Sequence, residues 1–140
     1  VAAVRGMVMS RKPQAVLTGK SPAPAGHYSQ AIRSGNNLYI SGQLPITTDQ
    51  APLPDRKFET QARQAIANML AILGPAGGKA QDLCRVTAYI VGVENWPEFN
   101  RIYSDILGDA KPARTVVPVP ELHYGYLVEI DAIAALPDQD

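Results

Sequence analysis

The sequence is poor in cysteine and has no excess of charge of either sign. Cys84 is the only cysteine of the 140 residues, which excludes an intrachain disulfide framework and is typical of a reducing compartment. Thirteen basic residues balance thirteen acidic ones. Because a polyanion is bound through a surplus of positive charge, we expect no nucleic-acid partner. The apolar neighbours Leu83 and Val86 predict a buried thiol.

Long apolar runs are also absent. No stretch approaches the roughly 20 residues that a transmembrane helix needs, and residues 1–9 are too short for a signal peptide with its cleavage site. We therefore expect a cytoplasmic protein with no membrane partner. The length suits one domain with one core. We place this domain at residues 13–140, after a flexible extension formed by residues 1–12.

Familiar catalytic motifs are missing as well. The chain has no phosphate-binding glycine loop, no histidine and cysteine cluster with the spacing of metal ligands, and no nucleophile elbow. Its two histidines, His27 and His123, lie far apart in predicted loops, and we expect both to be exposed.

The first half of the chain predicts a hairpin followed by a helix. Residues 28–33 and 38–43 favour strands, and they flank Ser34-Gly35-Asn36-Asn37, a composition typical of a tight turn. From Phe58 onward, apolar residues recur at steps of three and four up to Gly74-Pro75. This spacing predicts a helix with one buried stripe.

The second half predicts a strand, a helix and two further strands. Residues 83–91 are rich in β-branched and aromatic side chains and favour a largely buried strand. A helix is expected from Asn95, with Pro97 in its first turn, and the final strands cover residues 114–119 and 126–134. The expected buried face of this helix consists of Trp96, Phe99, Ile102, Tyr103, Ile106 and Leu107.

These elements define an α+β fold with the order ββαβαββ. Two helices interleaved with strands are expected to pack on one face of a mixed β-sheet. The other face then stays uncovered, which predicts an oligomer.

Two charged residues within apolar strands are candidates for a site. Arg114 and Glu129 lie on strands that we expect to be neighbours, and alternation places Glu129 on one face with Leu127, Asp131 and Ile133. A partly buried charge is usually paired or functional. From the residues alone, an ordinary salt bridge on the sheet is the simpler interpretation.

Five segments, in order between about Pro22 and Ala134, together resemble the RidA/YjgF family, also called endoribonuclease L-PSP. They are Gly26-His27-Tyr28-Ser29-Gln30-Ala31, Ser41-Gly42-Gln43-Leu44-Pro45, Gln61-Ala62-Arg63-Gln64, Pro112-Ala113-Arg114-Thr115 and Val128-Glu129-Ile130-Asp131-Ala132-Ile133-Ala134. The resemblance implies a chorismate-mutase-like fold. It also implies a homotrimer, in which three sheets form a central barrel with ligand clefts between subunits.

The resemblance also implies an activity and roles for individual residues. It implies hydrolysis of reactive 2-imino or enamine acids to 2-keto acids and ammonia, with no metal or cofactor. Arg114 would hold the substrate carboxylate, since a guanidinium binds a carboxylate through two parallel hydrogen bonds, and Glu129 would position the attacking water. The same comparison assigns Tyr28, Ser41, Gly42 and Asn100 to the cleft, and it places Val116 where many members carry cysteine.

Two other functions stay open at this point. A trimer that binds small carboxylates such as 2-keto acids without turnover would also use Arg114. An endoribonuclease would need two convergent proton carriers and a basic track for phosphates, and the sequence shows neither. The loop of residues 121–126 also departs from the commoner Leu-Pro-rich form of the family, which leaves the substrate range open.

Overall fold

Six strands form one mixed sheet in the order β1-β2-β3-β6-β4-β5, within the residues 12–138 that the computed structural model describes. Strands β4 and β5 are parallel, and all other neighbouring strands are antiparallel. The strands are β1 (Gln14–Val16), β2 (Ala31–Ser34), β3 (Asn37–Gln43), β4 (Leu83–Val91), β5 (Ala113–Val119) and β6 (Val128–Ala135). Apart from Lys12, the expected flexible extension lies outside the described residues.

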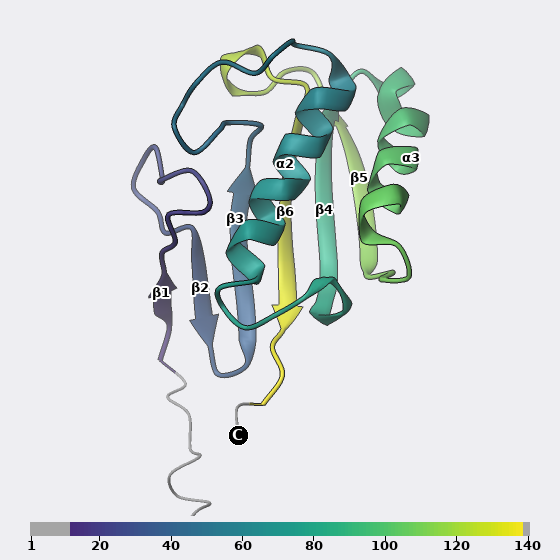
Figure 1. Cartoon of the computed structure of the whole chain (residues 1–140). Coiled ribbons are helices and arrows are strands. Elements are labelled where there is room, and N and C mark those ends of the chain that lie inside the picture. Colours follow the sequence, from purple (N-terminus) through teal and green to yellow (C-terminus); the bar gives the residue numbers. More distant parts are fainter. Residues whose placement is uncertain (1–11, 139–140) are drawn as a thin grey trace, which may run out of the picture.

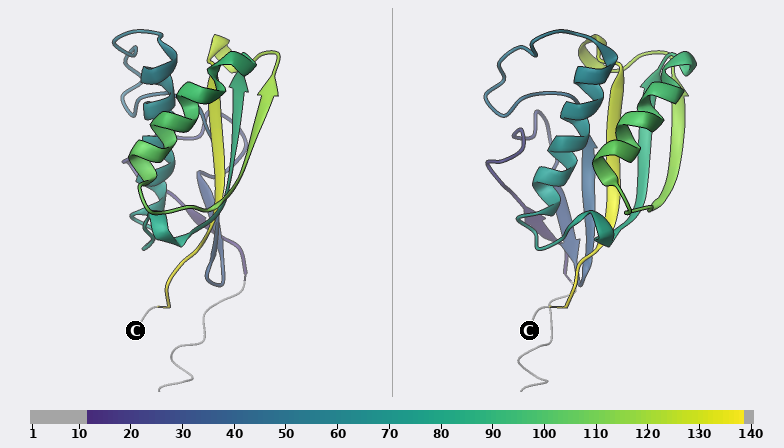
Figure 2. Two further views of the ribbon diagram at one scale, coloured as in Figure 1. Left: turned by 90° about the vertical axis from the view of Figure 1, so that its right-hand side faces the viewer. Right: turned by 45° about the vertical axis from the view of Figure 1, so that its right-hand side comes forward.

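Two helices cover one face of this sheet. Helix α2 (Phe58–Leu73) and helix α3 (Trp96–Leu107) lie on the same side of the strands, as two views of the molecule show (Figures 1 and 2). The described part of the chain also contains three short 3₁₀ turns: η1 (Ala80–Asp82), η2 (Val93–Asn95) and η3 (His123–Gly125). The predicted α+β fold with helices on one face is confirmed, and β1 is an additional short strand at the sheet edge.

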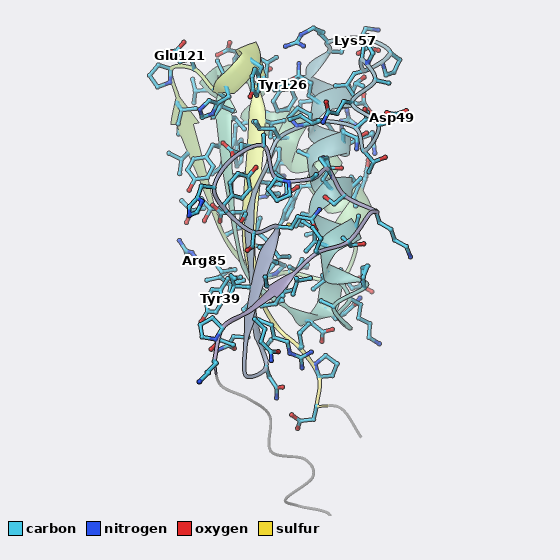
Figure 3. All side chains as sticks on the ribbon, turned by 90° about the vertical axis from the view of Figure 1, so that its left-hand side faces the viewer. Tyr39, Asp49, Lys57, Arg85, Glu121 and Tyr126 are labelled. Atoms are coloured by element: carbon cyan, nitrogen blue, oxygen red, sulfur yellow. The ribbon has the colours of Figure 1, made fainter. Side chains whose placement is uncertain are left out.

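The core lies between the helices and the sheet. Alternate residues of β6, from Val128 to Ala134, are buried, and so are Val86, Ala88 and Ile90 of β4. From α2 and α3 the fully buried apolar side chains are Ala62, Ala65, Ile66, Met69, Ile72, Phe99 and Ile102. No helix of the described residues covers the opposite face of the sheet, and Tyr39 and Arg85 project from that side (Figure 3).

Three local expectations are wrong. Cys84 is exposed, because it lies next to an irregularity in the pairing of β4 with β6 between Leu83 and Arg85. Trp96 is 44% exposed, since it occupies the first residue of α3 and lies at the end of the buried stripe. Tyr28 is not part of a strand, because pairing with β3 begins at Ala31.

The described residues 12–138 contain no helix that is long and apolar enough to cross a membrane.

Candidate functional site

Glu129 lies on the uncovered face of the sheet. Its neighbours along β6, Val128 and Ile130, are fully buried under the helices, and strand alternation therefore directs Glu129 and Asp131 to the other side. This confirms the predicted alternation. Glu129 is opposite Tyr89 of β4, at the end of β6 that adjoins the η3 loop.

A bulge in β3 makes room for the Glu129 carboxylate. The pairing of β3 with β6 is regular up to Ile40 and resumes at Gln43, so that Ser41 and Gly42 together oppose one residue of β6. A Cβ atom at Gly42 would overlap the Glu129 carboxylate, with the carboxyl carbon only 3.1 Å away. The carboxylate therefore fills the space that a side chain at position 42 would occupy.

A cleft of about 470 Å³ opens in front of this carboxylate. We call it the Glu129 cleft. The segment before β2, the β3 bulge, the chain that follows β3, and the η3 loop form its walls. It is lined by Ala25, Tyr28, Ser41, Gly42, Leu44, Ile46, His123, Tyr124 and Glu129, among others.

Buried polar side chains hold the walls of the Glu129 cleft in place. Gln30 donates from Nε2 to the carbonyls of Thr18, Ser21 and Pro22, and Asn68 of α2 donates from Nδ2 to the carbonyls of Leu44 and Ile46 at 2.9 and 2.8 Å. Each of these amides satisfies loop carbonyls that no strand pairs. The cleft is thus preorganised, because its loops are bound to the core rather than to solvent.

The Ser41 hydroxyl is part of the same framework. It donates to the carbonyl of Ser29 at 2.6 Å, and the Ser41 amide donates to the carbonyl of Gln30 at 2.9 Å. Tyr28 is 51% exposed, and its hydroxyl accepts a hydrogen bond from the Ala25 amide at 3.2 Å. Ser41 therefore fixes the wall that carries Tyr28, and the Tyr28 ring stays open to the cleft.

The η3 loop is clamped from α2 and the segment before it. Arg56 donates from Nη2 to the carbonyl of Tyr124 at 3.2 Å, and its guanidinium lies 4.9 Å from the centre of the Tyr126 ring. The buried amide of Gln61 accepts a hydrogen bond from the Leu127 amide at 2.8 Å. Tyr124 adopts the left-handed conformation, with φ of 61°, and 70% of it is exposed.

The uncovered face favours protonated carboxyls. Burial raises the pKa of Glu129 above its ordinary value, a nearby His123 opposes this, and Asp131 adds to it. Burial also raises the pKa of Asp131, against a hydrogen bond from the Tyr89 hydroxyl and the charge of Arg85. Glu129 is therefore a carboxyl that gives up its proton less readily than a free one, as a group that exchanges protons with a substrate should.

Arg114 lies on the opposite face of the sheet. It pairs in register with Val86, which is fully buried under the helices, and its Nη1 donates to Oδ1 of Asn100 on α3 at 3.0 Å. The guanidinium lies 5.0 Å from the centre of the Tyr103 ring. No carboxylate of the described residues 12–138 lies within salt-bridge distance of Arg114. Within this part of the chain its guanidinium group therefore has no anionic partner.

A second cleft, of about 380 Å³, surrounds this guanidinium. We call it the Arg114 cleft, and its lining includes Asn100, Tyr103, Leu107, Lys111 and Arg114. Burial raises the pKa of Tyr103, while Arg114 lowers it. Within the described part of the chain the Tyr103 hydroxyl is buried without a hydrogen-bond partner. The cleft therefore combines a cation, an amide and a phenol, which suits a small anion.

The predicted site residues thus separate into two groups. Tyr28, Ser41, Gly42 and Glu129 meet in one cleft, whereas Asn100 and Arg114 meet in the other. The expectation that the Arg114 and Glu129 strands are neighbours is wrong, because β4 lies between β5 and β6. A salt bridge between the two residues on the sheet is also excluded, since their side chains project from opposite faces.

Val116 follows Arg114 on the same face of β5 and packs against the core; it is not among the residues that line either cleft. Conversely, the sequence did not single out His123 or Tyr124 as site residues. His123 is exposed, as expected, yet it lines the Glu129 cleft. The unusual composition of residues 121–126 was the available signal for their participation.

Comparisons with known proteins agree with this architecture. The sequence model of the family described as endoribonuclease L-PSP matches residues 18–136. A RutC family protein from Pyrococcus horikoshii is 38% identical over 121 residues, which cover 86% of this chain and 96% of the relative. A 2-iminobutanoate/2-iminopropanoate deaminase from Dermatophagoides farinae is 31% identical over 121 residues, with 86% and 94% covered.

Solved structures show the same fold. The crystal structure of YyfA, a Rid-family protein from Yersinia pestis, superposes with a TM-score of 0.85 at 36% identity and covers 89% of this chain and all of YyfA (100%). The chain therefore belongs to the RidA/YjgF family, also called endoribonuclease L-PSP, with its chorismate-mutase-like α+β fold.

Proposed function

We propose that this protein is an imine deaminase that hydrolyses 2-imino or enamine acids to 2-keto acids and ammonia. The observation that carries the proposal is the pair of clefts. One presents a carboxyl with a raised pKa, and the other presents a guanidinium that has no salt bridge to any carboxylate of residues 12–138. A relative at 31% identity carries the name of such a deaminase, which supports the same reaction class.

The proposal requires a homotrimer. Arg114 and Glu129 project from opposite faces of one sheet, so a single chain does not present both to one small substrate. If the uncovered faces of three sheets close into a barrel, the Glu129 cleft of one subunit adjoins the Arg114 cleft of the next. Each shared site then contains both the Glu129 carboxyl of one subunit and the Arg114 guanidinium of the next.

The residues support a simple reaction sequence. Arg114 binds the substrate carboxylate, and a water molecule on Glu129 attacks the electrophilic C2 carbon of the protonated imine (C=NH2⁺). As the C–O bond forms, the C=N π pair moves to nitrogen and one water proton passes to Glu129. Glu129 returns this proton to the amine. The C–N bond then breaks with its pair on nitrogen, the hydroxyl becomes the carbonyl as its proton returns to Glu129, and ammonia takes that proton.

The experiment is the release of ammonia and keto acid from a freshly generated imine of a 2-amino acid. Arg114→Ala should leave the fold intact and lower kcat/KM on the order of 30- to 3000-fold, because losing a hydrogen-bonded charge partner costs roughly 2–5 kcal/mol. Arg114→Lys should recover part of the loss, since a point charge cannot form the two-pronged contact.

Arg101→Ala is the matched control. Arg101 lies on α3 beside Asn100 but pairs with Glu59 and Asp105 on the surface, so its loss should leave kcat/KM unchanged. If the wild-type protein binds a 2-keto acid through Arg114 but releases no ammonia, the protein is a binding trimer. If Arg114→Ala keeps wild-type turnover, the assignment of Arg114 is wrong.

A further inference from the structure

Tyr124 lines the Glu129 cleft in a backbone conformation that tyrosine rarely adopts. Its φ of 61° lies in the left-handed region, where a bulky side chain is an outlier. Residues with such strain persist where the surrounding structure enforces them, and they concentrate in ligand sites. Burial in the core does not explain Tyr124, because 70% of it is exposed. It also has no part in the proposed reaction sequence.

The residues around Tyr124 hold it in this position. Arg56 donates from Nη2 to the carbonyl of Tyr124 at 3.2 Å. The Tyr126 amide closes η3 by donating to the carbonyl of His123, also at 3.2 Å. The rings of Tyr124 and Tyr126 meet edge-on with 6.2 Å between their centres, and the Arg56 guanidinium lies over the Tyr126 ring. The Tyr124 ring is therefore a fixed part of the cleft wall.

Most polar side chains in the wall of the Glu129 cleft are bound to the protein itself. Gln30 donates to three carbonyls and accepts a hydrogen bond from the Thr18 amide at 2.7 Å. Gln43 donates to the carbonyl of Ser41 at 3.1 Å and accepts from the Ser21 hydroxyl at 3.3 Å. The Ser41 hydroxyl donates to a backbone carbonyl. These groups hold the wall together and are already engaged before a ligand enters.

The other part of the wall is apolar. It consists of Pro22, Ala23, Ala25, Leu44 and Ile46. Among the described residues that line the cleft none is lysine or arginine, so an anionic substrate side chain would meet the Glu129 carboxyl without either of these cations. The volume of about 470 Å³ lies within the range of roughly 300–1,000 Å³ for sites of drug-sized ligands. The cleft therefore has room for an apolar group much larger than a methyl.

We propose that Tyr124 is a specificity-determining residue that selects 2-imino acids with an aromatic side chain on C2. The inference rests on the proposed function, in which Arg114 of the next subunit binds the carboxylate and Glu129 directs water to C2. With those two groups placed, the C2 substituent is left to the apolar wall and the Tyr124 ring. Aromatic rings in offset or edge-on contact attract each other beyond the area that they bury, so an aromatic substituent gains more there than a methyl group.

The preference is tested first by binding, without turnover. Isothermal titration calorimetry compares phenylpyruvate with pyruvate, two 2-keto acids that differ by one phenyl group. Wild type should bind phenylpyruvate at least about 10-fold more tightly, since even one buried methylene is worth that factor. Tyr124→Asn removes the ring and keeps a residue that tolerates the left-handed conformation. It should raise the Kd of phenylpyruvate on the order of 10-fold, and that of pyruvate far less.

Two further variants and a stability measurement separate selection from folding. Tyr124→Phe should keep the preference, because the ring remains. Trp96→Ala is the matched control, since Trp96 is an aromatic residue of similar exposure to solvent (44%) that lines neither cleft. The thermal unfolding midpoint of Tyr124→Asn should not fall below that of wild type, because backbone strain is relieved. A merely structural tyrosine would lower the midpoint and weaken the binding of both keto acids alike.

The catalytic consequence is tested with imines freshly generated from phenylalanine and from alanine. The ratio of their kcat/KM values, measured by ammonia release, should favour the phenylalanine imine in wild type. In Tyr124→Asn this ratio should fall on the order of 10-fold, and in Tyr124→Phe it should be retained.

The outcomes separate the two proposals. If wild type binds neither keto acid, or both with the same Kd, the selective role of Tyr124 is wrong, whether or not the protein is a deaminase. The same holds if Tyr124→Asn keeps the full preference. If the preference depends on Tyr124 but wild type hydrolyses neither imine, the selectivity holds and the proposed function fails. If both imines are hydrolysed without preference, Tyr124 does not select substrates, and the catalytic part of the inference is overturned.

Discussion

At the scale of one residue, the absence of a side chain at Gly42 leaves space for the Glu129 carboxylate. The two-residue bulge at Ser41 and Gly42 brings β3 against the Glu129 carboxylate, at a position where even one methyl group would overlap it. The overlapping atoms belong to the end of a flexible side chain, so an added methyl group would displace the carboxylate rather than the fold.

Gly42→Ala should therefore fold normally and lose activity. A displaced carboxylate no longer holds the water in line with the substrate, and a misplacement of about 1 Å costs on the order of 100-fold in rate. The measurement is kcat/KM together with the thermal unfolding midpoint. Gly19→Ala is the control, since nothing lies within 4 Å of a Cβ atom there, and equal losses in both variants would contradict this explanation.

Asp131 predicts a pH dependence of stability. Burial raises its pKa above the ordinary value of 3.8, so the folded state binds this proton more tightly than the unfolded state does. The protonated Asp131 therefore contributes to the free energy of unfolding at pH values below the pKa of the unfolded state. This contribution is lost as the pH rises through the pKa of the folded state. Asp131→Asn should therefore gain thermal stability relative to wild type at about pH 7, and the difference should shrink toward about pH 4.

Glu59 provides a control of opposite sign. The hydrogen bond from Arg63 lowers the pKa of Glu59, which makes its stabilising contribution present at neutral pH and lost on acidification. Glu59→Gln should therefore lose stability at neutral pH, by a small amount because the pair is exposed. Parallel pH trends for the two variants would show that the sign assigned to Asp131 is wrong.

At the scale of an element, α2 both covers the sheet and organises the Glu129 cleft. Its apolar stripe was predictable from spacing, yet Gln61 and Asn68 occur on the buried side of the same helix. Gln61 binds the backbone at Arg56 and Leu127, and Asn68 binds the chain that follows β3. Two polar residues in a buried stripe are thus the connection between the helix and the loops of the site.

Asn68→Ala tests this connection. The variant leaves the carbonyl of Ile46 without its hydrogen-bond donor and removes one of two donors from Leu44. It should destabilise the protein by about 1 kcal/mol, because a part-buried acceptor is left unpaired, as measured by chemical denaturation. Hydrogen exchange should accelerate at the amides of Leu44 and Ile46, while Gln64→Ala, which loses a bond only to the Asn68 side chain, should change little.

At the scale of the whole molecule, the separation of the two clefts makes shared sites testable. Arg114→Ala and Glu129→Gln chains should each have at most a few per cent of the wild-type activity alone. When they are unfolded and refolded together in equal amounts, about one quarter of the interfaces in a trimer combine an intact Glu129 cleft with an intact Arg114 cleft. Activity should return to about a quarter of the wild-type value, at the mass of a trimer of 15.0 kDa chains.

A second mixture controls for this result. Arg114→Ala and Asn100→Ala alter the same cleft, so no interface between them contains an intact Arg114 cleft, and refolding them together should restore nothing beyond the parent chains. Recovery in both mixtures, or in neither, would contradict a site shared between subunits.

The sequence by itself determined the elements and their faces. The spacing after Phe58 predicted α2, and alternation around Glu129 predicted its place beside Asp131 and Ile133, because local periodicity records which side of an element is buried. Arg114 and Glu129 were identifiable as charges within apolar strands, although their partners were not.

Only the tertiary structure decided how those faces combine. Strand β4 lies between β5 and β6 and pairs Val86 with Arg114 but Tyr89 with Glu129, so that Arg114 and Glu129 project from opposite faces. No local pattern predicts which strands pair or in which register, since the hydrogen bonds join residues far apart in the chain. For the same reason the position of His123 in the wall of the Glu129 cleft depends on Arg56 and Gln61, which bind its loop from another part of the molecule.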